Sequence, residues 1–173
     1  YKFSQPTTES LMKTSSYYIV KYEVTNREYY KFLKNTNAVP PPHWENGIYP
    51  DGEDNYPVNF LTYQEVEKYA KWTGKRIPSE FEWEKAARGQ GLDIKINLDE
   101  SITITTFPLT YPFGQNFDPE LCNSKETNSG KTFSIYELAE KGASPYGAIG
   151  MCGNVAEWTS SWYLPYPGNF KKN

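Results

Sequence analysis

Three segments in the first half of the chain combine the apolar spacing of amphipathic helices with one shared polar signal. Each segment starts with a hydroxyl residue three positions before a glutamate, the pattern of a capping box. The boxes are Thr25-Asn-Arg-Glu28, Thr62-Tyr-Gln-Glu65 and Ser79-Glu-Phe-Glu82. Apolar residues recur at helical spacing after each box. The pattern predicts helices near residues 26–35, 63–73 and 80–88.

Strand signals are fewer and shorter. Residues 17–20 form a short apolar run that predicts a strand, and residues 101–107 alternate β-branched and polar side chains as in a hairpin arm. Residues 133–141 have short helical potential, and residues 144–169 are rich in glycine, proline and aromatics. Helices followed by irregular, turn-rich structure favour an α+β fold. A length of 173 residues corresponds to about one domain, which we expect to span 1–173.

Composition narrows the function classes. Aromatic residues make up 17% of the chain, which argues against disorder as its overall state. The net charge is −3 and no basic stripe is present, which argues against a nucleic-acid partner. No apolar run approaches the ~18 residues of a membrane span, and no signal peptide is visible in this segment.

Candidate chemistry is concentrated in one glycine-rich loop. Gly147, Gly150 and Gly153 allow sharp backbone turns there, and Asn154 and Glu157 supply oxygen donors. Calcium takes such ligands from flexible loops. The alternative is that Asn154 only holds a turn by bonding its own backbone.

The remaining reactive residues give weaker signals. His43 lies in the proline-rich loop 40–44 without ligand partners beside it, so we interpret it as a loop residue. Cys122 and Cys152 can form a disulfide if their Cα atoms come within ~7 Å. Otherwise they are two free buried thiols, which is the interpretation we favour.

Five ordered blocks together resemble the formylglycine-generating enzyme, or sulfatase-modifying factor, family. The similarity covers roughly residues 17–163. The blocks are Tyr22-Glu-Val-Thr-Asn26, Pro57-Val-Asn-Phe60, Lys75-Arg-Ile-Pro-Ser-Glu-Phe-Glu-Trp-Glu-Lys-Ala-Ala-Arg-Gly89, Tyr111-Pro-Phe-Gly114 and Gly153-Asn-Val-Ala-Glu-Trp158.

The resemblance implies a loop-rich variant of the C-type lectin fold with little regular secondary structure. It also implies an enzyme that oxidises a sulfatase cysteine to formylglycine with oxygen, copper and two cysteines on a C-terminal strand. Within 1–173 we expect the first strand and this catalytic strand to be missing. Cys122 and Cys152 match neither catalytic cysteine, so we expect no catalytic residue and no copper in this segment.

The resemblance also implies structural calcium ions, whose ligand positions transfer only in part. At one site the matching positions are Gly153 and Val155, through carbonyls, and Glu157, through its carboxylate. The family usually has Asn or Asp where this chain has Gly150. At the other site Asn123 and Ser124 match, but no acidic residue stands near residues 130–132.

Three functions follow from these observations. The first is a non-catalytic binding or structural module with a protein or peptide partner. The alternatives are an incomplete copy of a formylglycine-generating oxidase, and an accessory domain of a larger kinase-linked or iron-dependent enzyme. A single histidine argues against iron here. The family resemblance further implies a bacterial protein exported to the cell envelope. We also expect the side chains of Trp83 and Trp158 to be buried.

Overall fold

The computed structural model describes residues 14–89, 92–106, 109–137 and 141–164. Three helices are present in this part of the chain: α1 (Asn26–Thr36), α2 (Tyr63–Trp72) and α3 (Glu80–Arg88). Each starts at a capping box in which the N-cap hydroxyl accepts an amide and the glutamate accepts the N-cap amide in return. The three predicted helices are therefore confirmed, with ends that differ by one residue at most.

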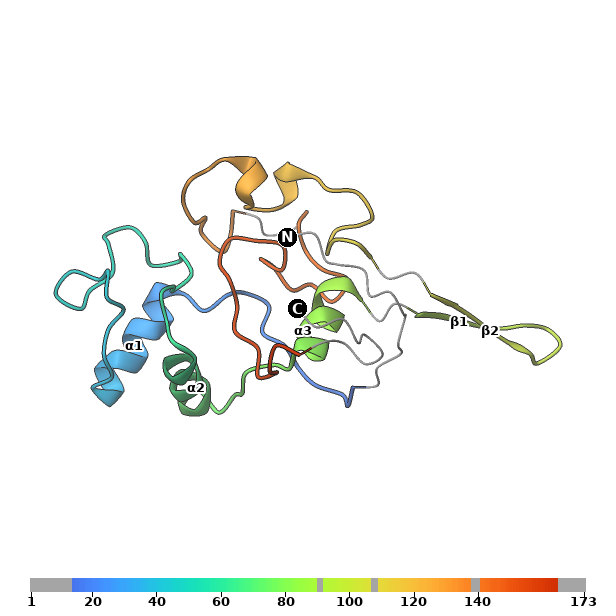
Figure 1. The fold of residues 1–173 in the computed structure, drawn as a ribbon, viewed down its shortest axis with the longest axis horizontal. Helices are drawn as coiled ribbons and strands as arrows, with labels where there is room; N and C mark the ends of the chain where they lie inside the picture. The colour runs from blue at the N-terminus through green and yellow to red at the C-terminus, as the bar shows by residue number, and fades with distance from the viewer. Residues whose placement is uncertain (1–13, 90–91, 107–108, 138–140, 165–173) are drawn as a thin grey trace.

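Helices α1 and α2 lie next to each other at one end of the molecule and share an aromatic core (Figure 1). We call this core the aromatic cluster, and its buried members are Tyr29, Phe32, Leu33, Trp44 and Tyr69. The rings of Tyr29 and Tyr69 meet with centroids 5.5 Å apart, which joins the two helices directly. Large rings thus supply most of the buried apolar surface here.

Helix α3 packs in a different way, against the loop that follows residue 147. Its buried face presents Ala86 and Ala87, which meet Ala148 and Met151. Small side chains on the helix let the loop backbone approach closely. This second group is called the alanine cluster below, and it places the glycine-rich loop beside α3.

The expected burial of the two tryptophans is wrong for Trp158 and only partly right for Trp83. Trp83 is half-buried against the alanine cluster. Trp158 is 49% exposed. Its indole N–H donates to the carbonyl of Leu61 at 3.0 Å, and its ring meets Tyr63 edge-on. An indole needs a polar partner, and this one finds it near the surface.

The strands β1 (Leu92–Ile96) and β2 (Ile102–Thr106) form an antiparallel hairpin, with Ile94 opposite Ile104. This confirms the strand predicted within residues 101–107. The hairpin extends away from the helices at the opposite end from α1 and α2 (Figure 1). Around its turn, Ile96, Leu98 and Ile102 are exposed.

Residues 17–20 do not form the predicted strand. Tyr18 is fully exposed, and no strand pairs with this segment among the described residues. The segment is held by separate bonds instead. The hydroxyl of Tyr17 donates to the carbonyl of Glu82, and the carbonyl of Lys21 accepts the amide of Ile149.

The second half of the described chain is mostly loop, with two short 3-10 turns, Pro119–Leu121 and Lys125–Thr127. Residues 135–137 form a turn rather than the start of the helix expected at 133–141, of which 138–140 lie outside the described residues. Within the described part, no helix has the length and apolar character needed to cross a membrane.

Candidate functional site

Two loops from distant parts of the sequence meet at the centre of the candidate site. The amide of Asn154 donates to the carbonyl of Asn123 at 2.7 Å. Beside this bond, a Cβ on Gly153 would lie 2.3 Å from the same carbonyl oxygen. Only glycine permits so close an approach of two backbones. The structure therefore brings together the two groups of candidate ligand residues that the sequence left apart.

The side chain of Asn154 ties this junction to a third segment. Its Oδ1 accepts the backbone N–H of Phe133 at 2.7 Å, and its Nδ2 donates to the carbonyl of Phe133 at 3.1 Å. Asn154 itself has a left-handed backbone with φ of 66°. Its amide group thus braces a neighbouring segment, so the alternative that Asn154 bonds only its own turn is wrong.

Hydrogen bonds from the protein already occupy the oxygens of Asn123 and Ser124. The Oδ1 of Asn123 accepts the hydroxyls of Thr127 and Ser129 at 3.3 and 2.7 Å. The carbonyl of Ser124 accepts the hydroxyl of Thr127 at 2.6 Å and its amide at 3.2 Å. These oxygens have donors where calcium would need free lone pairs. The residues at this second position do not fit a calcium ion.

The first candidate calcium position, at Gly153, Val155 and Glu157, has a different environment. It lies near Glu23, which stands just before α1. Glu23 is 8% exposed, and its Oε2 accepts the side-chain amide of Asn154 at 2.7 Å. Its Oε1 is buried and has no hydrogen-bond partner among the described residues. Burial raises the pKa of Glu23 to about 8. The hydrogen bonds from Asn154 and from the backbone amide of Val155 oppose this rise in pKa, and the charge of Glu157 adds to it.

The charge of Glu157 affects Glu23, and the side chain of Glu157 is exposed to solvent. Its carboxylate accepts the indole N–H of Trp83, which fixes it over α3. The side chain is exposed, yet the protein packed around it removes enough hydration to raise its pKa, against the effect of Trp83. The charge of Glu157 acts on Glu23, so these two carboxyl groups, one buried and one exposed, belong to the same region of the structure. The raised pKa leaves Glu23 largely protonated at neutral pH, so this pair holds less negative charge than two carboxylates would.

The thiols of Cys122 and Cys152 lie within hydrogen-bonding distance of each other, next to the loop junction. Cys122 is 2% exposed and Cys152 is half-buried, and both are free. Burial raises the pKa of Cys152 to about 12, and the hydrogen bond and charge of Cys122 add to this. Both thiols are free, as in the favoured interpretation, but only that of Cys122 is buried. At neutral pH, Cys152 stays protonated and is a poor nucleophile.

His43 occupies an exposed loop, as the sequence predicted, with its ring 5.1 Å from that of Phe60. Among the described residues, no group of three or more histidine, cysteine or acidic side chains is arranged to hold a metal ion. A cation at the Glu23–Glu157 pair would therefore also need backbone or amide oxygens.

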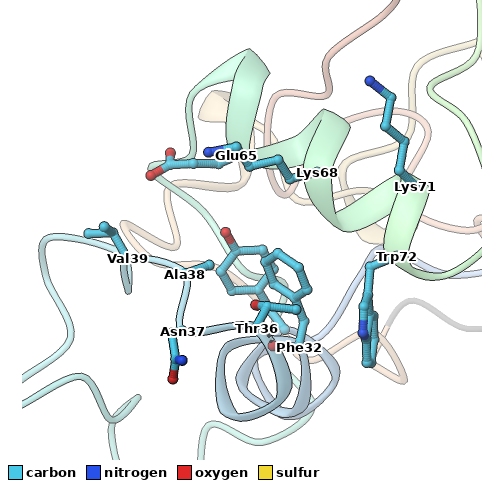
Figure 2. Close-up of a pocket in the computed structure, with 10 residues that line it drawn as sticks. Phe32, Thr36, Asn37, Ala38, Val39, Glu65, Lys68, Lys71 and Trp72 are labelled. Carbon is cyan, nitrogen blue, oxygen red and sulfur yellow. Dashed lines mark hydrogen bonds between the residues drawn. The ribbon is translucent and has the colours of Figure 1, made fainter.

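A groove between α1 and α2 is a second candidate site, which the sequence did not reveal (Figure 2). It has a volume of about 560 Å³. Tyr29 and Phe32 from α1 and Trp72 from α2 give it aromatic walls. Lys68 lies along α2 at its edge, whereas Lys71 points away from the groove and pairs with Glu67 at 3.0 Å (Figure 2). The spacing of these residues predicted a buried helix face, which Tyr29 and Phe32 provide, but not that Trp72, 40% exposed, would stand at the edge of a groove.

Comparison with known proteins identifies the family. The model of sulfatase-modifying factor enzyme 1-like domains matches residues 4–172. The chain belongs to this family. In the described residues of this chain, the family domain contains three α-helices, two short 3-10 turns and one β-hairpin.

Three relatives illustrate the range of proteins in which this family's sequence occurs. A formylglycine-generating enzyme of Thermomonospora curvata is 30% identical, over 73% of this chain and 41% of its own length. Hercynine oxygenase of Mycolicibacterium smegmatis is 28% identical, over 88% of this chain and 39% of its own length. Inactive C-alpha-formylglycine-generating enzyme 2 of Mus musculus is 29% identical, over 76% of this chain and 45% of its own length. The chain spans less than half the length of each.

Glu23 is the site residue that sequence reasoning missed. It stands inside the block Tyr22–Asn26, one of the five that carry the family resemblance, yet nothing local distinguishes it from a surface glutamate. Its burial depends on Asn154, which is 131 positions away in the chain. Only the folded chain reveals the pair with Glu157.

Proposed function

We propose that this chain acts as a non-catalytic binding or structural domain of the sulfatase-modifying factor family. The placement of Cys122 and Cys152 carries the proposal. Copper(I) needs soft, deprotonated ligands. Cys122 is almost fully buried, and the raised pKa of Cys152 keeps that thiol protonated. Cys122 is therefore inaccessible to a peptide, and Cys152 is a weak nucleophile at neutral pH.

Two further observations support the proposal. One relative is named as an inactive formylglycine-generating enzyme, so membership of the family does not by itself give activity. The groove between α1 and α2 supports the binding role, because it combines aromatic walls with the ammonium group of Lys68. That chemistry suits a protein or peptide partner with acidic and aromatic residues. The family resemblance supports a C-type-lectin-like arrangement of the loops around it.

A direct assay tests the absence of oxidase activity. The purified 173-residue chain is incubated with copper, oxygen, a thiol reductant and a cysteine-bearing sulfatase peptide, and mass spectrometry detects the aldehyde product. The formylglycine-generating enzyme of Thermomonospora curvata serves as the positive control. We expect no aldehyde from this chain. Aldehyde that disappears in Cys122→Ser or Cys152→Ser would overturn the proposal.

The second candidate function is that of one part of a longer oxidising enzyme. The 30% identity to a formylglycine-generating enzyme, over only 41% of that protein's length, favours it. Under this alternative, residues outside 1–173 supply the reactive groups. Sequencing the reading frame beyond Asn173 and repeating the assay with the longer chain would decide between the two candidates.

A further inference from the structure

We propose that Cys122 and Cys152 form a disulfide under oxidising conditions, which crosslinks the loop 122–124 to the loop 152–154. The structure shows the reduced state of this pair, in which both thiols are free. The crosslink would make the junction between the two loops sensitive to the redox conditions around the protein. This inference does not depend on the proposed function, because a domain with or without oxidase activity can carry such a bond.

The backbone beside the two cysteines already holds the loops in contact. The amide of Asn154 donates to the carbonyl of Asn123 at 2.7 Å. The side-chain amide of Asn123 donates to the Oδ1 of Asn154 at 3.0 Å. A Cβ on Gly153 would lie 2.3 Å from the carbonyl oxygen of Asn123. Cys122 and Cys152 each stand one position before a residue of this contact, so a bond between them requires little movement of the backbone.

The two sulfur atoms are close enough to interact. Cys152 lies within hydrogen-bonding distance of Cys122. The thiol of Cys122 donates to the carbonyl of Asp118 at 3.6 Å, so its sulfur remains able to accept the thiol of Cys152. The chain has only 2 cysteines in 173 residues, and the fold brings both of them to one place. Two unrelated packing thiols have no need to be neighbours, whereas a disulfide requires it.

The different exposure of the two thiols sets the order of the reaction. Cys152 is half-buried and can meet an oxidant, whereas Cys122 is 2% exposed. The thiolate of Cys152 attacks one sulfur of a small-molecule disulfide, which forms a mixed disulfide and releases one thiol. The sulfur of Cys122 then attacks the sulfur of Cys152 and releases the second thiol. The two cysteines together lose two protons and two electrons, and the small disulfide takes up both.

The rate and the equilibrium of this reaction depend on different properties of the pair. Burial and the neighbouring Cys122 raise the pKa of Cys152 to about 12, so little thiolate is present at neutral pH and the first step is slow. The equilibrium depends instead on how closely the fold holds the two sulfurs. The bond would also close a loop of about 30 residues, which restricts the unfolded chain and so stabilises the folded one. The pair therefore responds to sustained oxidation rather than to brief exposure.

Oxidation of the full 173-residue chain tests the inference. The protein is reduced, freed of reductant and incubated overnight with oxidised glutathione, and its intact mass is then measured with and without a thiol-alkylating reagent. We expect a chain that is lighter by two hydrogen atoms and takes up no alkyl group. A digest should contain one peptide pair joined through Cys122 and Cys152. The melting temperature should rise by roughly 5–10 °C, and a reductant should reverse the rise.

Single substitutions separate the crosslink from other effects of oxidation. Cys152→Ser, at a half-buried position, should show neither the mass change nor the shift in melting temperature. Cys122→Ser should keep a glutathione adduct on Cys152, because no second thiol can displace it; should this buried variant fail to fold, Cys152→Ser alone carries the comparison. Free thiols after sustained oxidation of the unmodified chain, a lasting glutathione adduct on it, or covalent dimers would each overturn the inference. An equal rise in melting temperature in Cys152→Ser would also overturn it.

Discussion

At the loop junction, the absence of a Cβ atom at Gly153 allows two backbone segments to approach each other closely. Its φ is 145°, and an added Cβ would lie 2.3 Å from the carbonyl oxygen of Asn123. Gly114 has nearly the same φ, 147°, but nothing within 4 Å of an added Cβ. We expect Gly114→Ala to cost about 1–3 kcal/mol of unfolding free energy from backbone strain. Gly153→Ala should cost clearly more, because the two loops must separate. Urea unfolding of both variants measures the difference, and equal losses would contradict this account.

Glu82 should make stability depend on pH in the acid range. The guanidinium of Arg76 binds its carboxylate at 2.7 and 2.8 Å, and the backbone amide of Ser79 adds a third bond. The ion pair and these hydrogen bonds lower the pKa of Glu82 from 4.5 to about 2. The folded state therefore binds this proton less readily than the unfolded state.

The stability from Glu82 is consequently complete above pH 4.5 and is lost as the pH falls towards 2. In Glu82→Gln the urea midpoint should start lower at neutral pH and fall less steeply between pH 4.5 and 2. The variant Glu120→Gln, at an exposed 3-10 turn, is the control and should keep the slope of the unmodified chain. If the urea midpoint falls with the same slope against pH in Glu82→Gln and in the unmodified chain, the ion pair does not contribute to the loss of stability in acid.

The individual residues differ in how much the sequence could say about them. Thr25 and Glu28 act on each other three positions apart, so their pairing could be predicted. Asn123 was expected to offer oxygens to calcium, but contacts with Thr127 and Ser129 satisfy its side chain instead. The role of Glu23 depends on a partner 131 positions away. Such long-range pairing leaves no local signal.

At the scale of elements, the caps decide where the helices start. The hydroxyl of Thr62 accepts the amide of Glu65 at the exposed start of α2, and the carboxylate of Glu65 accepts the amide of Thr62. We expect Thr62→Ala to lower the unfolding free energy by about 1 kcal/mol. Gln64→Ala, on the exposed surface of the same helix, should cost nothing, since alanine favours helices. Equal effects in urea unfolding would show that the cap bond adds nothing.

The same reasoning explains why helices were predicted better than strands. A capped helix satisfies its own hydrogen bonds, and its signal lies within a dozen residues. A strand needs a partner, and residues 17–20 find none among the described residues. The hairpin was predictable because β1 and β2 are close in sequence and pair with each other.

For the molecule as a whole, the hairpin is an extension that the rest of the described fold does not need. No helix packs against β1 or β2 in the described part of the chain. We expect replacement of Ile96, Leu98 and Ile102 by serine to leave the urea midpoint almost unchanged, because all three are exposed. Light scattering should also show less self-association, since fewer apolar groups face solvent. Ile135→Ser, at a position only 6% exposed, is the destabilising control. A large loss of stability in the hairpin variant would mean that these side chains do pack against the body.

The separation of the aromatic cluster from the alanine cluster has a consequence for how the molecule moves. Each cluster buries its own apolar surface, so α1 with α2 can lose order while α3 and the adjoining loop keep theirs. Amide hydrogen exchange would then report two sets of protection factors, one for each half. A ligand in the groove would slow exchange in the first set and leave the second set unchanged. Binding in the groove would then be thermodynamically independent of the order of the loop beside α3, so a partner could bind without altering that loop.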